Sequence, residues 1–217
     1  ALIRWIHPEK GFISPAKFIP VAERNGFIVP LGHAILLSAC QMRKKLLDEG
    51  VVSIRVAVNI SLKQFQQEDF TDQVIDILEV TGLEGRYLEL EITESIAMDS
   101  PEIVIEKLNT LRALDIHIAI DDFGMGYSSL NYLKRLPIQQ LKIDRAFIQD
   151  IDLPNDYAII KSIISMAESL SLRVVAEGVE TELQLSVLRS LHCDIIQGYY
   201  YYKPMPAQDV FTLLQQN

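Results

Sequence analysis

The sequence has 217 residues and a formal net charge of −9, and hydrophobic residues make up 49% of it. This length and composition are typical of a globular protein that buries one substantial core. The negative charge argues against a broad nucleic-acid-binding face, so we expect no DNA partner. To bind an anionic ligand, a protein with this net charge would need bound cations.

The cysteines and the apolar segments indicate the cellular compartment of the protein. Cys40 and Cys193 are far apart and show no metal-ligand spacing, so we predict two reduced thiols in a cytoplasmic protein. The longest apolar run, Ala34 to Cys40 interrupted by Ser38, is too short to cross a bilayer. We expect no signal peptide and no membrane insertion by this domain, which could still be the cytoplasmic part of a membrane-anchored protein.

Residues 1–6, Ala-Leu-Ile-Arg-Trp-Ile, have the pattern of a buried strand. We therefore expect that the chain begins inside an element and that further residues precede Ala1 in the parent protein. Upstream sensory or cyclase-type domains are part of this expectation.

Helix start and stop signals recur along the chain. Ser14 and Pro15 supply an N-cap and a first-turn proline to a helix that runs to Asn25 and stops at Gly26. Further helices are predicted at 31–49, after the capping boxes Ser61/Gln64 and Thr181/Gln184, from Pro101, around 160–170, and from about 129 to Leu136, before Pro137.

Short β-rich segments separate these helices. They are Val52–Asn59, Tyr87–Thr93, Ile116–Asp121, Gln140–Ile143, Arg173–Glu177 and Asp194–Gln197. With residues 1–6 and a strand near Tyr200, the count approaches eight. Alternating strands and helices predict a largely parallel sheet, and this number favours a closed (β/α)8 barrel formed by a single domain, residues 1–217.

The segment 115–129 is the most informative stretch of the chain. An apolar strand ends in Asp121 and Asp122, and Gly124 and Gly126 follow in the next loop. Two carboxylates at a strand end can hold a divalent cation, and the glycines permit unusual backbone angles or a close approach to a ligand. The alternative is a strand end followed by a solvated turn.

Each predicted strand ends in a polar residue. These are Asn59, Glu91, Asp121, Lys142, Glu177 and Gln197. Side chains alternate along a strand, so Glu89 and Glu91 share one face, as do Gln140 and Lys142, while the opposite face is apolar. We expect the polar face to point into the barrel and its ends to converge at the C-terminal mouth.

Each of these residues also has a structural explanation when taken singly. Asn59 could cap the helix after Ser61, Glu91 could pair with a buried arginine, Lys142 could neutralise Asp144, and Gln197 could bind backbone. Taken together, the carboxylates need cations, because crowded like charges cost stability. The set Asn59, Glu91, Asp121, Asp122 and Glu177 is all-oxygen, which suits Mg²⁺ or Mn²⁺, and Asp121 could bridge two ions.

These residues lie in motifs that resemble the EAL-domain cyclic-di-GMP phosphodiesterases over essentially the whole chain. The motifs are Ala1-Leu2-Ile3-Arg4-Trp5, Ser14-Pro15 with Phe18-Ile19-Pro20-Val21-Ala22-Glu23, Val58-Asn59-Ile60-Ser61, Leu90-Glu91-Ile92-Thr93-Glu94-Ser95, Asp121-Asp122-Phe123-Gly124, Leu141-Lys142-Ile143-Asp144, Ala176-Glu177-Gly178-Val179-Glu180 and Gln197-Gly198-Tyr199.

The resemblance implies a modified TIM-type barrel with one antiparallel strand, and hydrolysis of cyclic di-GMP to linear pGpG with two Mg²⁺ or Mn²⁺ ions. It implies metal ligands at Asn59, Glu91, Asp121, Asp122 and Glu177, catalytic or supporting roles for Lys142, Glu177, Gln197 and Glu94, and substrate contacts at Leu2, Arg4, Glu180 and Pro204. Glu94 would steady the loop after the aspartate pair, which in this family is linked to dimerisation, so a homodimer is expected.

Two departures from the family pattern bear on activity. The glutamate of the family motif, itself a metal ligand, should precede Ala1, so catalytic competence depends on that position. Met125 stands where the family usually has threonine, and the loss of one hydroxyl could loosen the loop by roughly 1 kcal/mol.

Two other functions are also compatible with the sequence. The first is an inactive cyclic-di-GMP receptor, which would bind the ligand without turnover. The second is a glycosidase with a carboxylate pair, which would keep its activity in EDTA but leaves Lys142 and Asn59 without a role.

Overall fold

A computed structural model describes residues 1–51, 54–97, 99–124 and 130–215. The chain divides into two compact units. Unit 1 consists of Ala1–Leu90, Thr110–His117 and Met205–Asn217, and unit 2 of Glu91–Asn109 and Ile118–Pro204.

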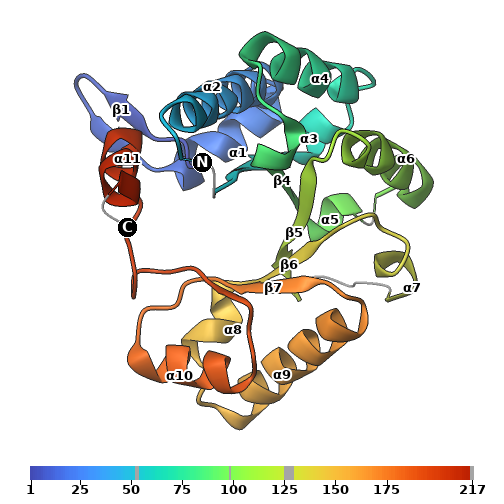
Figure 1. Cartoon of the computed structure of the whole chain (residues 1–217), viewed down its shortest axis with the longest axis vertical. Coiled ribbons are helices and arrows are strands. Elements are labelled where there is room, and N and C mark those ends of the chain that lie inside the picture. The colour runs from blue at the N-terminus through green and yellow to red at the C-terminus, as the bar shows by residue number, and fades with distance from the viewer. Residues whose placement is uncertain (52–53, 98, 125–129, 216–217) are drawn as a thin grey trace. The chain divides into compact units, whose positions relative to one another are not determined.

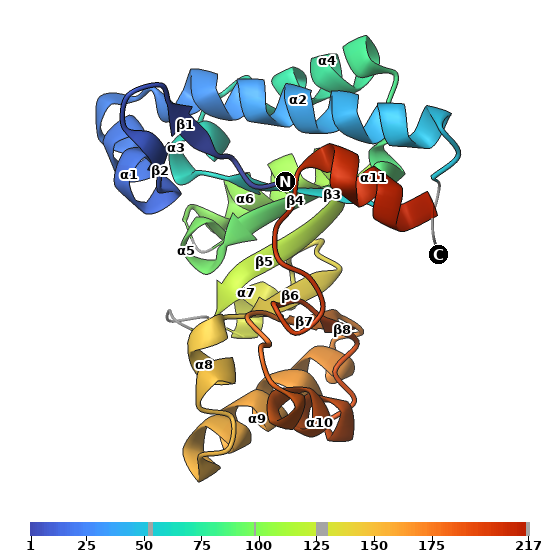
Figure 2. The ribbon, with the colours of Figure 1, turned by 90° about the vertical axis from the view of Figure 1, so that its left-hand side faces the viewer.

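Unit 1 is built around the long helix α2 (Ile28–Asp48). The other helical elements that lie within it are α1 (Pro15–Asn25), α3 (Leu62–Phe65), α4 (Phe70–Thr81), the short 3₁₀ helix η1 (Gly85–Tyr87) and α11 (Ala207–Gln215). Helix α2 packs against α1, α3, α4 and strand β3 (Val56–Ile60) (Figures 1 and 2). Its buried residues recur at helical spacing: Ile28, Gly32, Leu36, Ala39, Cys40, Arg43 and Leu46.

An antiparallel hairpin of β1 (Trp5–His7) and β2 (Gly11–Ile13) begins unit 1. The prediction of a buried strand over residues 1–6 was wrong in both its start and its burial, since Trp5 and Ile6 are 43% and 69% exposed. The hairpin is a two-stranded sheet of its own. Trp5 packs edge-on against Phe18 of α1.

Unit 2 contains the parallel strands that carry the candidate site. Strand β4 (Leu88–Thr93) enters it from unit 1, where its neighbour is β3, and the order continues as β4-β5-β6-β7-β8. The remaining strands are β5 (His117–Phe123), β6 (Gln140–Ile143), β7 (Arg173–Ala176) and β8 (Ile195–Ile196). From β5 to β8 each neighbouring pair is parallel, which confirms the predicted parallel arrangement.

Helices join the strands of unit 2. They are α5 (Glu94–Ala97), α6 (Pro101–Arg112), whose last residues belong to unit 1, α7 (Leu130–Leu133), α8 (Arg145–Gln149), α9 (Pro154–Ser169) and α10 (Glu182–Ser190). Helix α9 packs on β6 and β7, on the same side of these strands as α8 and α10 (Figures 1 and 2).

Most predicted elements are present, with shifted ends. Both predicted capping boxes form, and α1 ends at Gly26 in the left-handed conformation. Helix α2 begins at Ile28, three residues before the predicted start. The strand predicted near Tyr200 is absent, because the Tyr200 and Tyr201 amides donate to Val179 and Gly198 in a turn.

Within the described ranges, none of the helices is long and apolar enough to span a bilayer.

Replacement of Gly85 by alanine should destabilise unit 1. A Cβ at this position would lie 1.9 Å from the carbonyl oxygen of Leu114, so the backbone would have to move. We expect the free energy of unfolding to fall by about 1–3 kcal/mol, measured by urea denaturation. An unchanged midpoint would contradict this packing of residues 85 and 114.

Candidate metal centre

The side chain of Lys142, on β6, lies among carboxylates from three other segments. Its Nζ is 2.6 Å from Oε1 of Glu91, 3.0 Å from Oδ1 of Asp121 and 2.6 Å from Oε1 of Glu177. Glu91 lies on β4, Asp121 on β5, and Glu177 directly follows β7. Lys142 is only 3% exposed. All four side chains belong to unit 2, so the sequence-predicted convergence of these residues is observed there.

The parallel strand order explains this convergence. Neighbouring parallel strands end at the same edge of a sheet, and β4 to β7 are consecutive neighbours. Glu89 and Gln140, two residues before Glu91 and Lys142, are also buried, as expected for side chains on the same inward face. The opposite parity is apolar and buried as well, at Leu90 and Leu141.

A local irregularity brings two successive acidic residues to one place. The register between β5 and β6 shifts between Ile120 and Phe123, and Asp122 has a left-handed backbone with φ 53°. Regular alternation would send Asp121 and Asp122 to opposite faces. Instead, carboxylate oxygens of Asp121, Asp122 and Glu177 all lie within 4.8 Å of one another. This geometry makes the three carboxylates available to one cation.

The charges in this cluster influence each other's ionisation. Burial alone would lower the pKa of Lys142, but Glu91, Asp121 and Glu177 outweigh it and raise this pKa well above its usual range. Burial raises the pKa of Glu177, against the opposing effect of the Lys142 ammonium. The cluster is therefore a partly buried excess of negative charge, balanced in part by one fixed cation.

Asp122 has a pKa raised to about 6. The causes are burial, the neighbouring charge of Asp121 and a side-chain hydrogen bond with Asp144. Sequence reasoning missed this role of Asp144, whose Oδ1 also caps α8 by accepting a hydrogen bond from the amide of Ala146 at 2.7 Å. The signal in the sequence that could have indicated this role is a polar residue at a helix N-cap, two positions after Lys142.

The donor set fits a hard divalent cation. Oδ1 of Asp121 is buried and, among the described residues, accepts no hydrogen bond. Lys142 Nζ is 3.0 Å away, close enough for an ion pair, but the angles do not make a hydrogen bond. A buried carboxylate oxygen that accepts no hydrogen bond can be stabilised by a further cation, and an all-oxygen set suits Mg²⁺ or Mn²⁺.

Glu94 lies beside this cluster, at the start of α5. Its Oε2 accepts a hydrogen bond from the amide of Gly124, at 3.1 Å. Gly124 has φ 100°, and a Cβ there would lie 2.9 Å from the ring of Phe147, so this position requires glycine. Glu94 thus holds the chain directly after the aspartate pair, although Met125 lies outside the described residues.

The other predicted site residues are placed as follows. Asn59, Leu2 and Arg4 belong to unit 1, and their roles stay predictions. In unit 2, Glu180, Gln197 and Pro204 are exposed. The individual assignments as ligands and catalytic groups also stay predictions.

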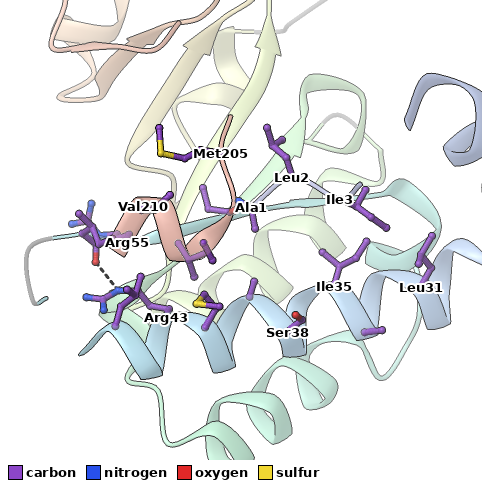
Figure 3. A pocket seen from close by; sticks show the side chains of 18 residues that line it. Ala1, Leu2, Ile3, Leu31, Ile35, Ser38, Arg43, Arg55, Met205 and Val210 are labelled. Atoms are coloured by element: carbon purple, nitrogen blue, oxygen red, sulfur yellow. Dashed lines mark hydrogen bonds between the residues drawn. The ribbon is translucent and has the colours of Figure 1, made fainter. Parts of the chain in front are cut away.

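In the described part of unit 1, two of the cavities have mainly apolar lining. One, of about 630 Å³, lies between α2, β3 and α11 and is lined by Leu2 among others (Figure 3). The second, of about 490 Å³, is lined by Arg4 and Trp5. No acidic side chain is among the described residues that line either cavity, so neither resembles the carboxylate cluster of unit 2.

Comparisons with known proteins identify similar sequences and structures. A family model described as "EAL domain" matches residues 1–204. The chain is 44% identical to the bifunctional diguanylate cyclase/cyclic di-GMP phosphodiesterase MucR of Pseudomonas aeruginosa, over 98% of this chain and 31% of that protein. It is 45% identical to the cyclic di-GMP phosphodiesterase NbdA of the same organism, over 95% of this chain and 26% of that protein. The chain thus spans less than a third of either relative.

A solved structure described as the MucR phosphodiesterase in complex with c-di-GMP matches with a TM-score of 0.94. It is 44% identical, and the match covers 96% of this chain and 85% of that one. This likeness confirms the predicted fold class, the modified TIM-type barrel with an antiparallel strand.

Replacement of Lys142 by methionine should strongly destabilise the metal-free protein. The change leaves the buried carboxylates of Glu91 and Asp121 and the partly buried one of Glu177 without their cation, so we expect a loss of about 3–5 kcal/mol at pH 7. Thermal and urea unfolding would measure this loss, with Lys161→Met on the exposed surface of α9 as the control. Added Mn²⁺ should recover part of the stability of the Lys142 variant, and no recovery would argue against cation binding by these carboxylates.

Replacement of Asp122 by asparagine should change how stability depends on pH. The pKa of Asp122 is about 6 in the folded chain and about 4 in an unfolded one. The folded chain therefore binds this proton more tightly than the unfolded chain, so protonation of Asp122 stabilises the fold. This contribution to the free energy of unfolding is complete below pH 4 and is lost as the pH rises through 6. Measured by urea unfolding in EDTA, Asp122→Asn should gain stability relative to the unchanged chain between these pH values. Parallel pH profiles would contradict the raised pKa.

Proposed function

Because the chain belongs to the EAL domain family, we propose that it is a phosphodiesterase that hydrolyses cyclic di-GMP to linear pGpG with the help of divalent metal ions. The observation that carries this proposal is the cluster of Glu91, Asp121, Asp122 and Glu177 around Lys142. The relatives named as cyclic di-GMP phosphodiesterases support the choice of substrate.

The cluster contains all the residues that would hold the metal except Asn59, which belongs to unit 1. Asp121, Asp122 and Glu177 would bind one ion, and Asn59, Glu91 and Asp121 would bind the other, with Mg²⁺ or Mn²⁺ as the expected metal. When bound, a pair of such ions supplies an activated water nucleophile and stabilises the charge that develops on the phosphoryl group. The proposal also explains how a chain of net charge −9 can bind a substrate with two phosphates.

The side chains of the cluster determine where protons are held. Hydrolysis of one phosphodiester bond adds one water, whose proton must leave as the P–O bond forms and whose other atoms stay on the phosphate. The leaving 3′ oxygen gains a proton. Lys142 remains charged at neutral pH because its pKa is raised, so it would orient an oxygen by donating hydrogen bonds rather than accept a proton. Glu177 would act as a carboxylate ligand of a metal ion, so the proton of the water would leave to solvent.

Further residues complete the proposed site. Leu2, Arg4, Glu180 and Pro204 would contact the substrate, and Gln197 would support the solvent in the site. Glu94, through Gly124, would keep Asp122 in place. We further propose that the protein acts in the cytoplasm, in agreement with its two free cysteines, and as a homodimer in a longer polypeptide with sensory or cyclase-type domains.

The assay for this proposal is incubation with cyclic di-GMP and Mg²⁺ or Mn²⁺, with separation of products by chromatography. We expect pGpG to form and EDTA to stop the reaction. Asp121→Asn should lower kcat/KM by about 100-fold or more, because it removes a charged ligand from both proposed ions. Asp152→Asn, which changes an exposed acid of unit 2, should leave activity unchanged.

A second preparation should carry glutamate before Ala1, the position at which the family motif predicts a further ligand. This preparation should be the more active of the two. Binding of cyclic di-GMP without turnover in both preparations, with or without chelator, would reject the phosphodiesterase and favour the receptor function. Turnover that persists in EDTA would reject metal dependence.

A further inference from the structure

The loop from Glu177 to Glu180 carries two of the proposed site residues and joins β7 to α10. Its backbone is bonded on two sides: the Glu177 amide donates to the carbonyl of Ile143 at 3.2 Å, and the Val179 amide donates to the carbonyl of Gln197 at 3.1 Å. Gly178 has φ 71°, and a Cβ there would lie 2.6 Å from Cβ of Arg145. The loop is therefore closely packed between neighbouring segments.

Gln184, in the first turn of α10, makes more contacts than a helix cap requires. Its Oε1 accepts hydrogen bonds from the amides of Glu180, at 2.8 Å, and Thr181, at 3.0 Å. Its Nε2 donates to the carbonyl of Ile148, at 3.1 Å. The side chain is only 8% exposed. A capping box needs only the bond to Thr181, the N-cap residue.

The additional bonds connect two segments that follow neighbouring strands of the metal centre. Ile148 is in α8, which begins three residues after Lys142 on β6, and Glu180 ends the loop after β7. Gln184 thus bridges the segment behind Lys142 and the loop that carries Glu177. A side-chain amide suits this bridge, because its oxygen can accept from two N–H groups while its nitrogen donates to a carbonyl.

We propose that Gln184 is a positioning residue of the metal centre, which fixes Glu177 and Glu180 relative to Lys142 by tying their loop to α8. The consequence for metal binding rests on the proposed function, whereas the bridge itself does not. Residues that hold metal ligands in place commonly contribute to metal affinity without contacting the metal.

Two substitutions separate this role from ordinary helix capping. Gln184→Glu keeps an oxygen for the amides of Glu180 and Thr181, and a negative charge in the first turn suits the helix dipole, but it cannot donate to Ile148. Thr181→Val is the matched control. It removes the hydrogen bond of 3.2 Å that the Gln184 amide donates to Thr181 Oγ1, and it leaves the bridge to Ile148 intact.

The first measurement is amide hydrogen exchange in the metal-free protein. In Gln184→Glu, the amides of Glu177 and Val179, which Gln184 does not touch, should exchange faster by about tenfold. In Thr181→Val, the exchange rates of these two amides should not change. The two variants are compared under conditions in which the thermal stability of the remaining fold is equal. In the unchanged chain, the Nε2 protons of Gln184 should exchange slowly, and exchange at the rate of an exposed amide would overturn the bridge without any variant.

The second measurement is Mn²⁺ affinity by calorimetry. Gln184→Glu should bind Mn²⁺ roughly tenfold more weakly, and Thr181→Val should bind it like the unchanged chain. Raising the Mn²⁺ concentration should then restore part of the phosphodiesterase activity of Gln184→Glu. Equal affinity in all three proteins would overturn the positioning role. If the unchanged chain bound Mn²⁺ but did not hydrolyse cyclic di-GMP, the proposed function would fail while this result stood.

Discussion

The ammonium of Lys142 faces carboxylates that come from three separate segments, at 2.6 to 3.0 Å, in a part of unit 2 that water scarcely reaches. A buried cation would be costly alone, and so would Glu91, Asp121 and Glu177 without it. Their mutual neutralisation is what allows so many charges to share one edge of the strands. It is also incomplete, because the carboxylates outnumber the single ammonium. This excess of negative charge is the physical basis for a divalent cation.

The sequence predicts this convergence because it depends on rules that act locally. Parity along each strand places Glu91, Asp121 and Lys142 on one face, and the alternation of strands with helices makes the sheet parallel, so that strand ends meet at one edge. The helix limits at Gly26 and the capping boxes of α3 and α10 are equally local, since they depend on a few neighbouring residues. The resemblance to EAL domains added the substrate, which these patterns cannot supply.

The features that sequence reasoning missed depend on contacts between distant residues. Nothing in the local pattern shows that Asp122 leaves regular strand geometry, or that Asp144 bonds to it. The extra role of Gln184 is of the same kind, because its capping box is visible in the sequence but Ile148 is not part of it. The exposed hairpin at Trp5 has an apolar sequence typical of a buried strand, and only its two-stranded pairing reveals the difference.

The central claim is that the carboxylates around Lys142 hold a divalent cation. The most direct measurement is the anomalous scattering of Mn²⁺ in crystals of the protein grown with that ion. We predict a peak in contact with oxygens of Asp121, Asp122 and Glu177, at roughly 2.0–2.3 Å, as is usual for such ions. A map without a peak at these residues, with the Lys142 ammonium still in contact with all three of its carboxylate partners, would contradict the account.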